Sequence, residues 1–213
     1  MLALGLGAPL GTLLCLGAHS DDAEIGCGGT VLRLLEEQPE AHVVWVVLAA
    51  AGERREEAVE SARRLLGAAS HEIVVEEFRD GFLPHDAVRV KERFEALKAA
   101  VDPDLILTHA RDDMHQDHRL VNELTWNTWR SHLILEYEIP KVDGDLGRPN
   151  LYVPLTAEQV ERKVSHLLEA FPTQRGKHWF DAELFRGLMR VRGMEAVSPS
   201  GYAEAFHARK LVL

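Results

Sequence analysis

The sequence has little of what stabilises small secreted proteins or marks a membrane protein. Only two of its 213 residues are cysteines, Cys15 and Cys27, and both stand in apolar or glycine-rich stretches, so we expect no disulfide framework. No apolar run reaches the roughly 18 residues that a membrane-spanning helix needs. Residues 1–16 are apolar but carry no basic signal-peptide segment, so they predict a first strand. These absences favour a cytoplasmic protein with no transmembrane segment.

Positive charge is scarce as well. The chain has 24 lysines and arginines against 34 aspartates and glutamates, a formal net charge of −10, and no run rich in lysine or arginine. A nucleic-acid-binding surface needs clustered basic residues to neutralise phosphates, so we expect no nucleic-acid partner. The composition leaves the oligomeric state open, including a homo-oligomer.

The chain contains no internal repeat, no low-complexity tract and no linker of domain-separating length, and its length suits one domain over residues 1–213. Short apolar runs predict strands at 12–17, 43–48, 72–76, 104–108 and 133–139. Helical periodicity between them predicts helices at 25–37, 53–66, 87–100 and 118–129. This alternation predicts a doubly wound α/β fold with a mostly parallel, Rossmann-like sheet. The C-terminal region is less regular, with helices expected at 156–169 and 181–191 and a closing strand within 202–213.

A polar segment, Ala18-His19-Ser20-Asp21-Asp22-Ala23-Glu24, directly follows the first predicted strand. It places one imidazole beside two adjacent carboxylates, so one carboxylate can bind a cation while the other, facing elsewhere, stays free as a base. The glycines after it let the backbone turn tightly and let the first helix pack closely on the sheet. An ordinary helix N-cap turn has the same residue types. This segment alone does not decide between a cation-binding site and an N-cap turn.

A second polar segment, His109-Ala110-Arg111-Asp112-Asp113-Met114-His115-Gln116-Asp117-His118, lies at a predicted strand-to-helix junction. His115 and His118 are three residues apart, so both can face one site at the start of a helix. The alternative is a solvated polar loop. Ligands of open α/β sheets bind at the carboxyl ends of the strands, so two such segments at two strand ends favour one shared metal site.

Both segments resemble signatures of the LmbE-like (PIG-L) de-N-acetylase family. The first is similar to Ala-His-Pro-Asp-Asp, with Ser20 in place of proline. The second is similar to His-x-Asp-His, with Gln116 where proline is common, and neither change removes a ligand. The resemblance covers most of the chain through further segments: Gly52-Glu53, Leu65-Leu66-Gly67, Asp80-Gly81, Arg192-Gly193 and Tyr202-Ala203-Glu204-Ala205-Phe206.

The resemblance implies three ligands for one zinc ion (Zn2+) per chain: His19, Asp22 and His118. Another divalent ion such as Fe2+ is the alternative. By the same resemblance, Asp21 is the general base and His115 the acid or oxyanion stabiliser, while Asp117 orients His115, tunes its pKa and favours its charged form. Arg54 is a substrate contact, although a helix-surface charge pairing with neighbouring glutamates explains it equally well.

These roles suit amide hydrolysis. A metal ion with three protein ligands keeps an open coordination position and lowers the pKa of water there. A free carboxylate can take the proton of that water, and a positioned imidazole can stabilise the oxyanion. The resemblance therefore implies a zinc-dependent hydrolase that removes the N-acetyl or another N-acyl group from an N-acetylglucosamine-type amino sugar or its conjugate.

Two alternative functions use the same residues. His19, Asp21 and His118 also match the two-histidine, one-carboxylate triad of non-haem Fe(II) oxygenases, but such sites usually lie in antiparallel β-barrels, whereas this chain alternates strand and helix. A non-catalytic metal-binding module is the second alternative, and it has no need of a spare base or acid beside the ligands. We therefore expect the hydrolase, with a small-molecule amino-sugar conjugate whose identity the sequence does not reveal.

Overall fold

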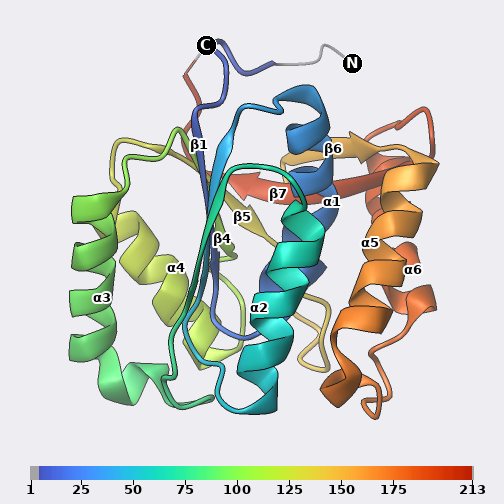
Figure 1. Ribbon diagram of the computed structural model, residues 1–213. Coiled ribbons are helices and arrows are strands. Elements are labelled where there is room, and N and C mark those ends of the chain that lie inside the picture. The colour runs from blue at the N-terminus through green and yellow to red at the C-terminus, as the bar shows by residue number, and fades with distance from the viewer. Residues whose placement is uncertain (1–4, 213) are drawn as a thin grey trace.

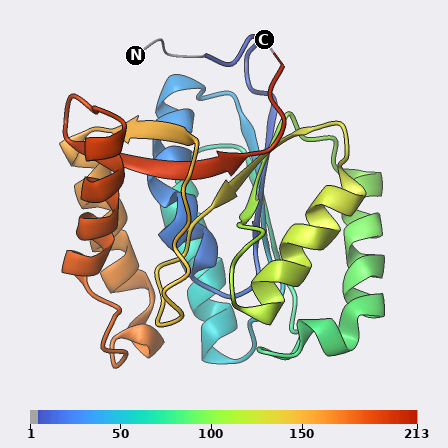
Figure 2. The same cartoon turned by 180° about the vertical axis from the view of Figure 1, so that it is seen from behind.

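The computed structural model describes residues 5–212, which form a seven-stranded sheet between two layers of helices (Figures 1 and 2). The spatial order of the strands is β3-β2-β1-β4-β5-β7-β6. Their bounds are β1 (Thr12–Gly17), β2 (His42–Val47), β3 (His71–Val75), β4 (Leu105–His109), β5 (Leu133–Tyr137), β6 (Leu151–Leu155) and β7 (Tyr202–Ala208). Strands β1 to β5 are parallel, and β7 runs antiparallel to both β5 and β6. The predicted doubly wound, mostly parallel α/β fold is confirmed.

Helices cover both faces of the sheet (Figure 1). One layer contains α1 (Asp22–Glu37), α2 (Glu53–Leu66), α5 (Ala157–Ala170) and α6 (Ala182–Glu195). The other layer contains α3 (Ala87–Ala100) and α4 (Gln116–Thr128). Two short 3-10 helices, η1 (Leu83–Asp86) and η2 (Pro172–Gln174), lie in the connections.

The central strands are apolar along their whole length because both of their faces are covered. In β1, Leu13 and Cys15 belong to one apolar core, whereas Leu14 and Leu16 belong to the other. This alternation follows from the two-residue period of a strand. Cys15 and Cys27 are both buried and free, as the sequence predicted.

The C-terminal region differs most from the sequence-based expectation. Strand β6 was not expected, and it includes Pro154, a residue that is tolerated at the edge of a sheet because no ladder hydrogen bond is lost there. The closing strand β7 ends at Ala208. Helices α1 and α4 begin at Asp22 and Gln116, three and two residues earlier than predicted, because the polar first turns add nothing to the hydrophobic period.

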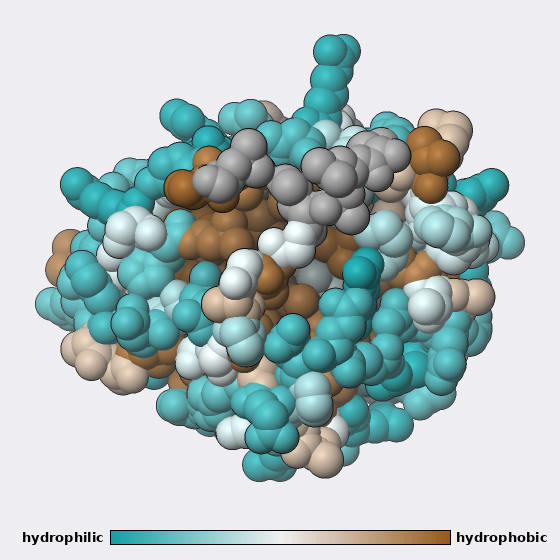
Figure 3. Space-filling view, turned by 90° about the horizontal axis from the view of Figure 1, so that it is seen from above, coloured by the Kyte–Doolittle hydropathy of each residue, from teal (hydrophilic) through white to brown (hydrophobic). Residues whose placement is uncertain are grey.

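The two ends of the described chain lie at the same end of the molecule (Figure 1). Seen from that end, hydrophobic residues show at the surface among hydrophilic ones (Figure 3). Leu6, Leu211 and Val212, all close to the chain ends in sequence, are exposed. Within residues 5–212 no helix combines the length and the apolar character that crossing a membrane requires.

Candidate active site

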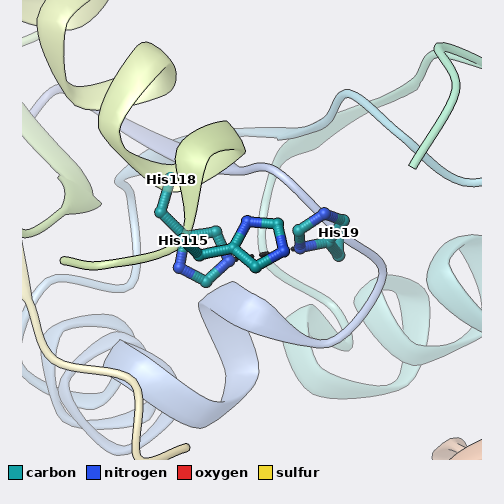
Figure 4. A group of neighbouring side chains, drawn as sticks. All are labelled: His19, His115 and His118. Carbon is teal, nitrogen blue, oxygen red and sulfur yellow. Dashed lines mark hydrogen bonds between the residues drawn. The ribbon is translucent and has the colours of Figure 1, made fainter. Parts of the chain in front are cut away.

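The two polar segments meet because β1 and β4 are neighbours in the sheet. Thr12–Gly17 pairs in parallel with Leu105–His109, so the residues that follow both strands emerge at the same edge. His19 comes from the segment after β1, whereas His115 and His118 come from the start of α4, and the three rings gather at one place (Figure 4). The two polar segments therefore meet at one edge of the sheet, as their positions after two strands predicted.

Three buried donor atoms form a small triangle at this place. The His118 Nε2 atom lies 3.2 Å from His19 Nδ1, and Asp22 Oδ2 lies 3.3 Å from His19 Nδ1 and 3.4 Å from His118 Nε2. Zinc–ligand bonds of about 2.0–2.2 Å place the ligands of a tetrahedral ion roughly 3.3–3.6 Å apart. The three side chains that the sequence proposed as ligands therefore present their donor atoms at a spacing that one tetrahedral metal ion could bridge.

The charges around the triangle favour a cation. Burial opposes ionisation of His118, yet the Asp22 charge and the hydrogen bond to Asp113 raise the pKa of His118 to about 9. Burial also opposes ionisation of His19, but Asp22 and Asp117 raise its pKa well above the ordinary value. The negative charges that raise the pKa of these two imidazoles also favour a divalent ion in place of the protons, because metal and protons compete for the same nitrogen atoms.

Asp21 lies beside the triangle and is not one of its three corners. It occupies the N-cap position of α1, but its side chain makes no capping hydrogen bond, so the N-cap alternative does not account for this residue. Its side chain is buried, and the nearest cation is Arg54, whose Nη2 atom lies 3.5 Å from Asp21 Oδ1. Burial and the neighbouring Asp22 charge raise the pKa of Asp21.

Arg54 faces the site from the first turn of α2. Its Nε atom donates to Ser20 Oγ at 3.1 Å, and its Nη1 atom donates to Asp80 Oδ2 at 2.8 Å. The guanidinium thus joins the segment after β1 to Asp80, and its ion pairs are with aspartates of the site and not with glutamates of its own helix. Ser20, which stands where the resembling family has proline, supplies a hydroxyl for this contact.

His115 occupies the N-cap position of α4, and its Nδ1 atom accepts a hydrogen bond from the Asp117 backbone N–H at 3.3 Å. In the neutral ring the proton therefore lies on Nε2, which can donate. Burial, followed by the charges of His118 and His19, lowers the pKa of His115. The Asp117 charge opposes this shift, as expected of it, but burial and the two imidazoles outweigh it.

The Asp117 carboxylate also lies differently from the expectation. It accepts hydrogen bonds from the backbone N–H groups of Gly81 at 2.7 Å and Leu83 at 3.1 Å, and its Oδ2 atom lies 3.2 Å from His19 Nε2. The carboxylate thus contacts His19, and Asp117 contacts His115 only through its backbone N–H. The reason is geometric, because helix positions two apart do not face each other.

Two buried residues of the second segment have contacts that sequence reasoning did not assign. Asp113 Oδ2 lies 2.9 Å from His118 Nδ1, the ring atom that does not face the triangle. His109 stacks on His118 with ring centroids 3.9 Å apart, and its Nε2 atom lies 3.2 Å from Asp22 Oδ2. Burial and the His118 charge lower the pKa of His109 to about 4. The burial of Asp113 and His109 excludes the solvated-loop alternative for this segment. The density of histidine and aspartate in the segment was the sequence signal that could have identified both residues.

A comparison with known protein families matches the part of the chain that contains this site. A family model described as PIG-L: GlcNAc-PI de-N-acetylase matches residues 14–129, more than half of the chain and both polar segments. The chain belongs to this family. The oxygenase alternative is thereby excluded, because the chain is a member of a family of hydrolytic de-N-acetylases with an α/β fold.

Solved structures of similar fold include enzymes of more than one kind. The N,N'-diacetylchitobiose deacetylase from Pyrococcus horikoshii is 22% identical with a TM-score of 0.71, over 93% of this chain and 84% of that one. The zinc-inhibited form of teicoplanin deacetylase Orf2 is 17% identical with a TM-score of 0.72, over 92% and 97%. GalB, the 4-carboxy-2-hydroxymuconate hydratase from Pseudomonas putida KT2440, is 19% identical with a TM-score of 0.72, over 95% and 98%.

Identities this low show a shared fold, and the hydratase among them shows that this fold alone does not determine the reaction. The comparison with curated proteins gives no match. The family match and the geometry of the polar segments carry the functional argument.

Proposed function

We propose that the protein is a zinc-dependent hydrolase that removes the N-acetyl group from an N-acetylglucosamine-type amino sugar or its conjugate. The observation that carries the proposal is the triangle of three buried donor atoms, 3.2–3.4 Å apart, with the spare carboxylate of Asp21 beside it. A site that only binds metal does not need this fourth buried side chain, so the presence of Asp21 favours a catalytic site over a metal-binding module.

His19, Asp22 and His118 would hold the ion. In each imidazole, the ring nitrogen that does not face the triangle contacts a carboxylate. Asp113 Oδ2 lies 2.9 Å from His118 Nδ1, and Asp117 Oδ2 lies 3.2 Å from His19 Nε2. Carboxylates in these positions orient a ligating histidine and raise its basicity. When bound, the ion supplies a Lewis acid for the carbonyl group and lowers the pKa of water at its open coordination position.

Asp21 would act as the general base. It takes a proton from the attacking water while the oxygen forms a bond to the amide carbon, and it returns that proton to the nitrogen as the C–N bond breaks. Burial and the adjacent Asp22 charge raise the pKa of Asp21, which brings it closer to neutral pH, where a group serves well both as base and as acid. The products are a neutral amine and acetic acid, and the second proton of the water leaves when the acid ionises to acetate.

His115 would stabilise the oxyanion. Because its Nδ1 atom accepts the Asp117 backbone N–H, its Nε2–H is left to donate to the carbonyl oxygen as negative charge develops there. One such donor contributes roughly 10²–10³ to the rate. Because the Nε2 atom is the one left to donate, the oxyanion is assigned to His115 and the leaving-group proton to Asp21.

Arg54 would bind the sugar part of the substrate at the mouth of the site. Its guanidinium is held by Ser20 and Asp80 and remains one-quarter exposed. Asp80, which is half-exposed, offers a carboxylate acceptor to sugar hydroxyls beside the guanidinium donor. An adjacent donor and acceptor are what a hydroxyl-rich substrate needs for orientation.

The test is acetate release by the zinc-loaded full-length chain. The substrates are N-acetylglucosamine, N,N'-diacetylchitobiose and N-acetylglucosamine linked to phosphatidylinositol, each measured before and after chelation. We expect release from at least one of them, loss of release on chelation, and recovery with added zinc. A zinc-loaded protein that releases acetate from none of the three would overturn the proposal.

A further inference from the structure

Two carboxylates lie beside the ring nitrogen of His19 that does not face the donor triangle. The His19 Nε2 atom lies 3.1 Å from Asp80 Oδ1 and 3.2 Å from Asp117 Oδ2. The hydrogen bond of this nitrogen is with Asp117, so Asp80 is a second negative charge at the same atom. The contact between Asp80 and His19 joins the sugar-binding edge of the proposed site to one of its proposed metal ligands.

Asp80 lies in a tight turn formed by residues 79–82. The backbone N–H of Phe82 donates to the Arg79 carbonyl at 3.1 Å. Gly81 has a φ of +78°, which the third position of a type II turn requires and which glycine adopts without steric cost. The turn therefore places the Asp80 side chain through a defined backbone conformation.

The first turn of α4 holds this backbone in place. The Asp117 carboxylate accepts the Gly81 N–H at 2.7 Å, and Gln116 Nε2 donates to the Gly81 carbonyl at 3.0 Å. The other carboxylate oxygen of Asp80 accepts from Arg54 Nη1 at 2.8 Å. Asp80 is half-exposed, yet its backbone and its side chain are both fixed.

We propose that Asp80 is a positioning residue that strengthens His19 as a metal ligand. A carboxylate beside a ligating imidazole raises the basicity of the ring and stabilises the positive charge that the ring gains when it binds an ion. This inference rests on the zinc site of the proposed function but not on the reaction. A role of Asp80 limited to sugar hydroxyls would change KM and leave the zinc affinity unchanged.

The test is the zinc affinity of the full-length chain, measured by competition with a chelator, together with the number of zinc ions bound per chain. We expect Asp80→Asn to lower the zinc affinity by about tenfold, the lower end for such a contact, because Asp117 stays in place. The matched control is Asp112→Asn, which removes the same charge from an exposed residue of the second polar segment and should change the affinity less than about twofold.

A second pair of variants tests the turn. In Gly81→Ala the nearest atom to the added Cβ would be Gln116 Nε2 at 3.8 Å, so the substitution strains the backbone at φ +78° without a clash. Gly67→Ala adds the same kind of strain at φ +57° after α2, with no atom within 4 Å. We expect Gly81→Ala to lower the zinc affinity by about threefold, since movement of the turn relieves the strain of a left-handed alanine. Gly67→Ala should leave it unchanged.

Unchanged zinc affinity in Asp80→Asn, or a loss no larger than that of Asp112→Asn, would overturn the proposal, as would equal affinities of the two glycine variants. Two zinc ions per wild-type chain but one per Asp80→Asn chain would also overturn it, because His19, Asp80 and Asp117 would then hold a second ion. A wild-type chain that binds no zinc would sink the proposed zinc site as well. The expected affinities without any acetate release would sink the proposed deacetylation and leave the role of Asp80 intact.

Discussion

Replacing Asp21 by asparagine separates the proposed base from the neighbouring proposed ligand, Asp22. Asparagine keeps the shape of the side chain but cannot accept the proton of water at neutral pH. The Asp21 side chain is 6% exposed and makes no capping hydrogen bond. Arg54 keeps its contacts with Ser20 and Asp80 when the charge of Asp21 is removed, so the substitution changes little besides the chemistry.

The magnitude follows from the lost role. General base catalysis contributes typically about 10²–10⁴ to the rate, which corresponds to roughly 2.7–5.4 kcal/mol of barrier. We therefore expect turnover by Asp21→Asn to fall by that factor with the zinc content unchanged. The stability should not fall, because a carboxylate whose pKa is raised in the folded protein, by burial and by Asp22, costs stability when it is ionised.

The adjacent Asp22→Asn is the matched control. Asp22 Oδ2 lies within 3.4 Å of both proposed imidazole ligands, so this variant should lose zinc as well as activity, because a neutral oxygen replaces an anionic ligand. Acetate release, zinc content by mass spectrometry and urea unfolding are measured on the same preparations. Loss of zinc from Asp21→Asn, or near-normal turnover, would refute the assignment of the base.

Three further outcomes are expected elsewhere in the chain. Asp113→Asn should lower zinc affinity by about 10–100-fold in competition with a chelator, because it removes the carboxylate that contacts His118 Nδ1. The control is Asp145→Asn, which should leave zinc affinity unchanged because Asp145 shares Lys141 with Asp113 but does not contact His118. Thr156→Ala removes the capping box of α5 and should lower the free energy of unfolding in urea by about 1 kcal/mol. Burial lowers the pKa of His166 to about 4. Between about pH 7.5 and about pH 5 the wild type should therefore lose about 2 kcal/mol more of its free energy of unfolding than His166→Gln does.

The sign of the His166 effect follows from proton binding. The unfolded side chain binds a proton below its ordinary pKa of about 6.5, whereas the folded one does so only below about 4. Its contribution to stability is complete above pH 6.5 and is lost as the pH falls toward 4. Equal acid sensitivity of the wild type and the variant would contradict this account. For Thr156→Ala, an unchanged urea midpoint would show that the capping box contributes nothing.

The sequence by itself determined the α/β architecture and the meeting of the two polar segments. Alternating apolar runs and helical periods predict parallel strands, and parallel strands bring their carboxyl ends to one edge. A His/Asp segment after each of two such strands therefore converges without any knowledge of packing. The meeting of the two segments was predictable for this reason, whereas the choice of His19, Asp22 and His118 within them came from the family resemblance.

Only the tertiary structure decided which side chain supports which histidine. Asp117 lies two positions from His115 in sequence, yet its carboxylate contacts His19, 98 residues away, because the start of α4 turns it toward β1 and toward the backbone of Gly81. Periodicity and spacing encode local structure and strand ends, but the direction of a polar side chain in a first helical turn depends on the donors and acceptors that folding brings against it.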